Sequence, residues 1–128
     1  MLGFVELRCL IVDDNADFLH AARALLERQG IDVVAVASSG SEALERLDEL
    51  RPDVALIDVD LGDESGFELA RRFAERADGA PPVILISTYA EIDVADMVSA
   101  SPAAGFVSKS QLSAQLIRDV LASEPPGT

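Results

Sequence analysis

Short apolar runs alternate with longer amphipathic stretches along almost the whole chain. Runs dominated by Val, Ile, Leu and Ala are typical of strands that are buried on both faces, and they occupy residues 7–12, 31–37, 54–57, 83–86 and 105–108. Between and after these runs, apolar residues recur at three- and four-residue spacing, which predicts amphipathic helices. The pattern therefore predicts five strands and five helices in strict alternation.

Turn-forming and capping residues mark where the predicted helices begin and end. The first helix carries its apolar face from Phe18 to Leu26 and ends near Gly30, a residue that suits a helix C-terminus. Residues 38–41 form a turn that caps the second helix, and that helix stops before Pro52. The remaining helices are predicted over residues 67–77, 91–99 and 111–121.

This alternation predicts the α/β fold class, with a doubly wound five-stranded parallel sheet and helices on both faces, flavodoxin-like in its (βα)5 order. The chain has 128 residues, which is near the commonest size of a single domain, and it shows no internal repeat. We expect one domain over residues 1–122. Residues 123–128 are predicted to be a flexible tail or the start of a linker.

Reactive side chains follow four of the predicted strands: Asp13 and Asp14, Asp58, Ser87 and Thr88, and Lys109. In a parallel sheet the carboxyl ends of the strands lie at one edge, which is where α/β proteins bind their ligands. We therefore expect these carboxylates, hydroxyls and the amine to meet at one site.

The chemistry of this set favours a hard divalent cation and phosphoryl transfer. Three converging carboxylates repel one another unless a cation joins them, and oxygen ligands without His or Cys select Mg²⁺, with Mn²⁺ as a substitute. In-line phosphoryl transfer needs a nucleophile, a metal and donors to the phosphoryl oxygens. Asp58 can be the nucleophile, and Lys109 and Ser87 can be the donors.

Composition narrows the location and the partners. The chain carries 23 acidic residues against 10 Lys and Arg, a net charge of −13, so its surface repels phosphate backbones and direct nucleic-acid binding is not expected. No apolar run is long enough to cross a membrane, and no signal peptide is visible. The lone Cys9 is interpreted as a reduced core thiol. We expect a cytoplasmic protein without membrane contact.

Four segments in order resemble the receiver domain of two-component response regulators: LIVDDN, RPDVALIDVDLGDESGFEL, PPVILIST and AAGFVSK. The resemblance extends over residues 7 to 122. It implies that Asp14 and Asp58 hold the metal directly, that Asp13 acts through a water, and that the main-chain carbonyl of Asp60 is a further ligand.

The same resemblance implies a switch rather than an enzyme. Asp58 would accept a phosphoryl group from a sensor histidine kinase or a histidine phosphotransfer protein, with Lys109 pairing to that group, and the domain would promote its own phosphorylation and dephosphorylation. Ser87 and Phe106 would form the switch pair. A homodimer partner or an effector protein would bind the face made by the helix at 91–99, the strand at 105–108 and the last helix.

The chain departs from the common pattern of the family at several positions. Ser87 stands where Thr is frequent, Ser110 follows Lys109 where Pro is frequent and commonly cis, and Gly62 replaces a frequent Pro. None of these changes removes a reactive group. The choice of Ser87 over Thr88 rests on the resemblance, and Tyr89 is a further candidate for the rim of the site.

Several alternatives stay open at this point. The pair Asp13-Asp14 could be a helix N-cap rather than a metal site. Asp58-Val59-Asp60 matches the Asp-x-Asp motif of haloacid-dehalogenase-like phosphatases, although those enzymes carry it on their first strand. A flavin binder would need a Ser/Thr/Gly-rich phosphate loop after the first strand. A receiver fold that serves only as a non-phosphorylated interaction module is the remaining alternative.

Overall fold

The structure is a computed structural model that describes residues 6–76, 79–88 and 91–123. Strands and helices alternate along the chain: β1 (Arg8–Val12), α1 (Ala16–Arg28), β2 (Asp32–Ala37), α2 (Gly40–Leu50), β3 (Val54–Asp58), α3 (Gly66–Ala74), β4 (Val83–Ser87), α4 (Glu91–Ser99), β5 (Gly105–Ser108), a 3-10 turn (Lys109–Gln111) and α5 (Ala114–Ser123). The predicted α/β fold class is confirmed.

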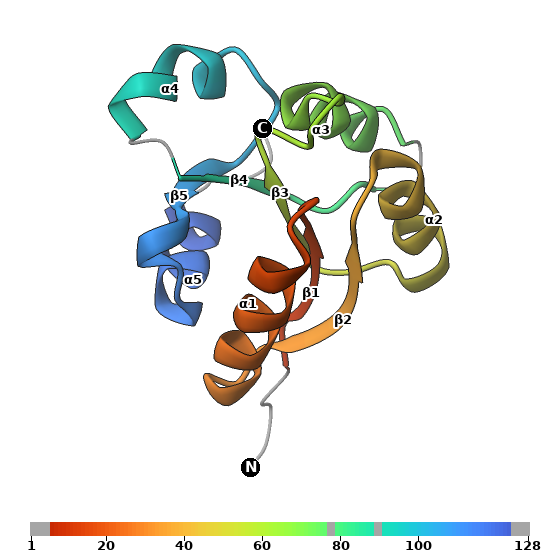
Figure 1. Ribbon diagram of the computed structural model, residues 1–128, viewed down its shortest axis with the longest axis vertical. Coiled ribbons are helices and arrows are strands. Elements are labelled where there is room, and N and C mark those ends of the chain that lie inside the picture. The colour runs from red at the N-terminus through yellow and green to blue at the C-terminus, as the bar shows by residue number, and fades with distance from the viewer. Residues whose placement is uncertain (1–5, 77–78, 89–90, 124–128) are drawn as a thin grey trace.

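The five strands form one parallel sheet in the order β2-β1-β3-β4-β5. The chain first moves outward from β1 to β2 and then crosses back to β3 on the other side of β1. Helices α1 and α5 therefore cover one face of the sheet, and α2, α3 and α4 cover the other (Figure 1). The reversal between β1 and β3 is where a doubly wound sheet leaves a crevice at the carboxyl ends of its strands.

Two apolar cores sandwich the sheet. Every residue of β3 and β4 is buried, whereas β2 at the sheet edge alternates between buried and half-buried positions. Leu26 of α1 and Ile117 of α5 are fully buried on one face, and Phe73 of α3 is fully buried on the other. No helix in the described part of the chain is long and apolar enough to span a membrane.

Most element boundaries agree with the sequence prediction, but the last helix begins later than the predicted residue 111. The 3-10 turn Lys109–Gln111 occupies the predicted first residue of the helix. The Ser113 hydroxyl then accepts a hydrogen bond from the amide of Leu116, so the helix begins at Ala114. The third helix also ends at Ala74, three residues before the predicted end. The predicted tail at 124–128 lies outside the described residues.

Helix α3 starts in direct contact with the end of β3. The amide of Gly66 donates to the carbonyl of Val59 at 2.9 Å, and a Cβ at position 66 would overlap the main-chain carbonyl of Asp58. Only glycine leaves room for this approach. The first turn of α3 is thereby held against the residue that ends the central strand.

We expect Gly66→Ala to destabilise the protein by about 3 kcal/mol, because the added methyl meets main-chain atoms that have no room to move. Gly40→Ala is the matched control, since the methyl there would meet the carboxylate end of the flexible Glu64 side chain and should cost far less. Urea denaturation of both variants measures the difference. Equal losses of stability would contradict the assigned close approach.

Candidate functional site

The first part of the site is the end of β1. Asp13 is fully buried; its amide donates to the carbonyl of Ala37 at 3.0 Å, and its Oδ1 accepts the amide of Asn15 at 2.9 Å. Asn15, not the acidic pair, caps α1, because its side chain accepts the amide of Phe18 at 3.2 Å. The N-cap interpretation of Asp13-Asp14 is therefore wrong. Both carboxylates are left for other contacts, and that of Asp14 is exposed.

The second part is the end of β3. Asp58 is 6% exposed and offers its carboxylate to two donors. Oδ1 accepts the amide of Asp60 at 3.1 Å, and Oδ2 accepts the ammonium of Lys109 at 2.9 Å. The loop that follows is ordered by its own bonds, since the Asp60 carboxylate accepts the amide of Gly62 at 3.1 Å. Because Asp58 lies on the third strand, the chain lacks the first-strand placement of a haloacid-dehalogenase-like phosphatase.

Lys109 reaches this pair of carboxylates from the 3-10 turn after β5. Its Nζ forms ion pairs with Asp13 Oδ2 and with Asp58 Oδ2, so one ammonium bridges residues delivered by two different strands. The side chain is only 13% exposed, and the ring of Phe18 lies beneath the ammonium, 4.4 Å from Nζ to the ring centroid. The peptide bond between Lys109 and Ser110 is trans.

Burial and pairing shift two pKa values in the site. Burial raises the pKa of Asp58 above its ordinary 3.8, and the negative charge of Asp13 adds to this, against the opposing pull of Lys109 and the Asp60 amide. Burial alone would lower the pKa of Lys109, but its bonds to Asp13 and Asp58 outweigh burial and raise it above 10.5. Lys109 therefore remains a cation over the physiological range.

The acidic groups fit a divalent cation. Asp13, Asp14 and Asp58 each offer a carboxylate oxygen, and these oxygens lie within 4.8 Å of one another. They border a hollow of about 230 Å³ that is also lined by Asp60 and Lys109. An all-oxygen donor set beside an exposed opening suits Mg²⁺, which keeps several waters when it binds protein carboxylates. Lys109 already neutralises part of the cluster, so an incoming ion has to compete with it.

One member of the predicted switch pair, Ser87, borders this hollow, and the other, Phe106, lies on the neighbouring strand. Ser87 ends β4, is buried, and borders the hollow together with the exposed Thr88. Phe106 is half-buried on β5, opposite Leu85 of β4, and packs against the apolar core on the α3 side of the sheet. The structure thus places a hydroxyl and an aromatic ring on adjacent strands. Tyr89 lies outside the described residues.

Two residues of this region escaped the sequence analysis. Glu64 accepts the amide of Gly40 with both carboxylate oxygens, at 3.1 and 3.2 Å, and so ties the loop after β3 to the start of α2. Phe18, interpreted only as part of an apolar helix face, contacts Lys109. Neither contact has a sequence signature, because each joins residues more than twenty positions apart.

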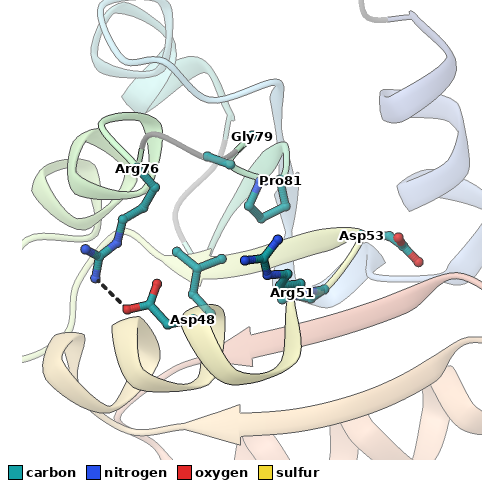
Figure 2. Close-up of a pocket in the computed structure, with 9 residues that line it drawn as sticks. Asp48, Arg51, Asp53, Arg76, Gly79 and Pro81 are labelled. Carbon is teal, nitrogen blue, oxygen red and sulfur yellow. Dashed lines mark ion pairs between the residues drawn. The ribbon is translucent and has the colours of Figure 1, made fainter.

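A larger hollow of about 600 Å³ lies at the opposite edge of the sheet, where α2 ends and β3 and β4 begin (Figure 2). Three of its charged groups have partners: Arg76 pairs with Asp48 at 3.4 Å, and the Asp53 carboxylate accepts the amide of Arg8 at 2.9 Å. Arg51, in the left-handed conformation at the end of α2, also borders it. Among the described residues, the carboxylates that could share a metal ion are Asp13, Asp14 and Asp58, so we assign the reactive site to the smaller hollow.

Comparison with known proteins agrees with this geometry. A family model described as response regulator receiver domain matches residues 9–121. A protein-glutamate methylesterase/protein-glutamine glutaminase of Koribacter versatilis is 31% identical over 121 residues, covering 92% of this chain and 33% of that protein. The DNA-binding response regulator MtrA of Mycolicibacterium paratuberculosis is 35% identical over 91 residues, covering 71% of this chain and 38% of MtrA. The chain thus spans about a third of the length of these relatives.

Solved structures give the same result at the level of fold. The response regulator domain of Thermotoga maritima CheB superposes with a TM-score of 0.79 at 23% identity, covering 97% of this chain and all of that chain. A LuxR-family two-component response regulator from Aurantimonas superposes with a TM-score of 0.79 at 29% identity, covering 92% of this chain and 84% of the other.

We expect Mg²⁺ to raise the melting temperature of the protein, because the ion binds the folded acidic cluster and not the unfolded chain. At a hundred times its dissociation constant it would add about 2.7 kcal/mol to the free energy of unfolding. Asp14→Asn should remove most of this response, and Asp48→Asn, with the same charge change in the larger hollow, should keep it. Thermal melts with and without Mg²⁺ measure both; an unchanged response in Asp14→Asn argues against the cluster as the binding site.

The raised pKa of Asp58 sets a pH dependence for the metal-free protein. A carboxyl whose pKa exceeds its ordinary 3.8 binds more protons in the folded state, so its contribution to the free energy of unfolding falls as pH rises above that value. Lys109 titrates above 10.5, outside the relevant range. We therefore expect Asp58→Asn to gain stability relative to the unsubstituted protein from about pH 4 to about pH 7, measured by urea denaturation with a chelator. A difference that shrinks over this range would refute the raised pKa.

Proposed function

The chain belongs to the response regulator receiver domain family of two-component signalling, and on that basis we propose that it is a phosphorylation switch. Asp58 accepts a phosphoryl group in a Mg²⁺-dependent reaction. The observation that carries the proposal is the environment of the Asp58 carboxylate: it ends the central strand, bonds Lys109 at 2.9 Å, and shares a cluster with Asp13 and Asp14. A nucleophile, a fixed cation and metal ligands thus occupy one site.

In the proposed reaction a carboxylate oxygen of Asp58 attacks the phosphorus of a phosphohistidine, forming an O–P bond while the P–N bond breaks. The released imidazole takes a proton from solvent. Lys109 neutralises a phosphoryl oxygen, which the low exposure of its side chain makes more effective, and the Ser87 hydroxyl donates to another. The amide of Asp60 holds the carboxylate in place through Oδ1.

The metal ligands are proposed residue by residue. Asp14 and Asp58 would hold the ion directly, Asp13 would act through a water, and the main-chain carbonyl of Asp60 would complete the protein ligands. When bound, Mg²⁺, or Mn²⁺ as its substitute, neutralises the negative charge that gathers on the transferring phosphoryl group. The difference in burial supports these different roles, because Asp13 is fully buried whereas Asp14 is exposed to incoming ions.

A receiver domain implies a histidine kinase as its partner in signalling. We propose a sensor histidine kinase or a histidine phosphotransfer protein as the phosphodonor. Phosphorylation would draw the Ser87 hydroxyl toward the new oxygens and let Phe106 change rotamer on the neighbouring strand, which biases an existing two-state equilibrium. The face formed by α4, β5 and α5 would then bind a second copy or an effector protein.

The domain assignment is also a proposal. Residues 1–122 would form the receiver domain, and 123–128 would be a flexible tail or the start of a linker. The names of two relatives describe a methylesterase and a DNA-binding regulator, and this chain matches about a third of each. We propose that the output controlled by Asp58 is carried by the partner that binds the face formed by α4, β5 and α5.

We expect incubation with acetyl phosphate and Mg²⁺ to add the mass of one phosphoryl group, and Asp58→Asn to prevent this addition while keeping the fold. Asp48→Asn is the control, because it makes the same charge change at the larger hollow, away from the acidic cluster. Intact-mass spectrometry reads both variants. Labelling that persists in Asp58→Asn would place the phosphoacceptor elsewhere, and an unlabelled parent protein would favour the interaction-module alternative.

A further inference from the structure

The ring of Phe18 is set beside the reactive lysine by the cap of α1. Asn15 accepts the amide of Phe18 at 3.2 Å, which places Phe18 in the first helical turn, four residues after Asp14. One side of the ring packs against the apolar core shared with α5, and Lys109 Nζ lies 4.4 Å from the ring centroid. Nζ therefore contacts an aromatic face as well as the carboxylates of Asp13 and Asp58.

We propose that Phe18 is a positioning residue, whose aromatic face holds the Lys109 ammonium over the phosphoacceptor when a divalent ion shares the site. The inference rests on the proposed function and deepens it. A cation above an aromatic ring is attracted by the negative charge of the ring face, and this attraction grows as water is excluded. The lysine side chain is 13% exposed, so the contact is largely desolvated.

The competition between two cations explains why the ring matters. Asp13 and Asp58 belong both to the ion pairs of Lys109 and to the carboxylate cluster that suits Mg²⁺. A divalent ion at that cluster would weaken the hold of both carboxylates on the ammonium and would repel it as a like charge. Within the described part of the chain, Nζ contacts Asp13, Asp58 and the ring of Phe18, and of these the ring alone is not shared with the ion. It is therefore the contact that keeps Lys109 in place in the loaded site.

This role has a consequence that general loss of structure cannot mimic. Removing the ring frees Lys109 to leave, so phosphoryl acceptance at saturating Mg²⁺ should slow. A lysine that leaves the loaded site also no longer repels the ion at close range, so Mg²⁺ should bind more tightly. A disturbed fold would instead weaken both metal binding and phosphorylation.

The test compares Phe18→Leu, which keeps apolar bulk, with Phe18→Tyr, which keeps the aromatic face. For Phe18→Leu we expect phosphorylation by acetyl phosphate to slow roughly two- to five-fold and the Mg²⁺ dissociation constant, measured by calorimetry without phosphodonor, to fall by a similar factor. Phe18→Tyr should keep both the phosphorylation rate and the Mg²⁺ dissociation constant at the values of the unsubstituted protein. Phe67→Leu, at a half-buried aromatic on the other face of the sheet, should leave both unchanged.

A double-mutant cycle tests whether Phe18 acts through the lysine. In the Lys109→Met background, Phe18→Leu should no longer change the Mg²⁺ dissociation constant, since the competing cation is gone. Weaker Mg²⁺ binding in Phe18→Leu, a failure of Phe18→Tyr to restore it, or the same shift in the Lys109→Met background would each overturn the proposal. The calorimetric arm needs no phosphorylation, so its failure and the failure of the proposed phosphoacceptor are read separately.

Discussion

One ammonium group holds together a cluster of negative charge that the sheet would otherwise force into repulsion. Parallel strands bring their carboxyl ends to one edge, and β1 and β3 lie side by side there with Asp13 and Asp58 at their ends. Lys109 follows β5, the outermost strand on the side of β4, and pairs with both carboxylates. The ion pairs therefore link three separate stretches of chain and let two acidic residues remain buried together.

The same arrangement changes what binding of a divalent ion means for this protein. Lys109 already acts as the counter-ion of the cluster, so Mg²⁺ has to compete with a bound cation rather than fill a bare acidic site. The affinity for the ion then depends on every group that stabilises the lysine. Residues with no oxygen to offer, such as Phe18, thereby influence a site made of carboxylates.

The sequence predicted those features that depend on local pattern. Buried runs fixed the strands, and the rule that parallel strands end at one edge predicted that Asp13, Asp58 and Lys109 would meet. Features that depend on contacts between distant residues were not predictable. The bond from Glu64 to Gly40 needs the spacing between a loop and a helix, and the start of α5 depends on a 3-10 turn with no periodicity of its own.

The closeness of Gly66 to the Asp58 carbonyl has an evolutionary meaning. Every other residue type carries a Cβ, so the codon for position 66 cannot drift without separating α3 from the strand that presents the acceptor. Variation that retunes the signal must accumulate elsewhere around the hollow, at exposed positions such as Thr88 or in the packing around Lys109. Among descendants of such a chain, Gly66 would therefore stay unchanged while exposed positions without a metal-binding role around the hollow diverge.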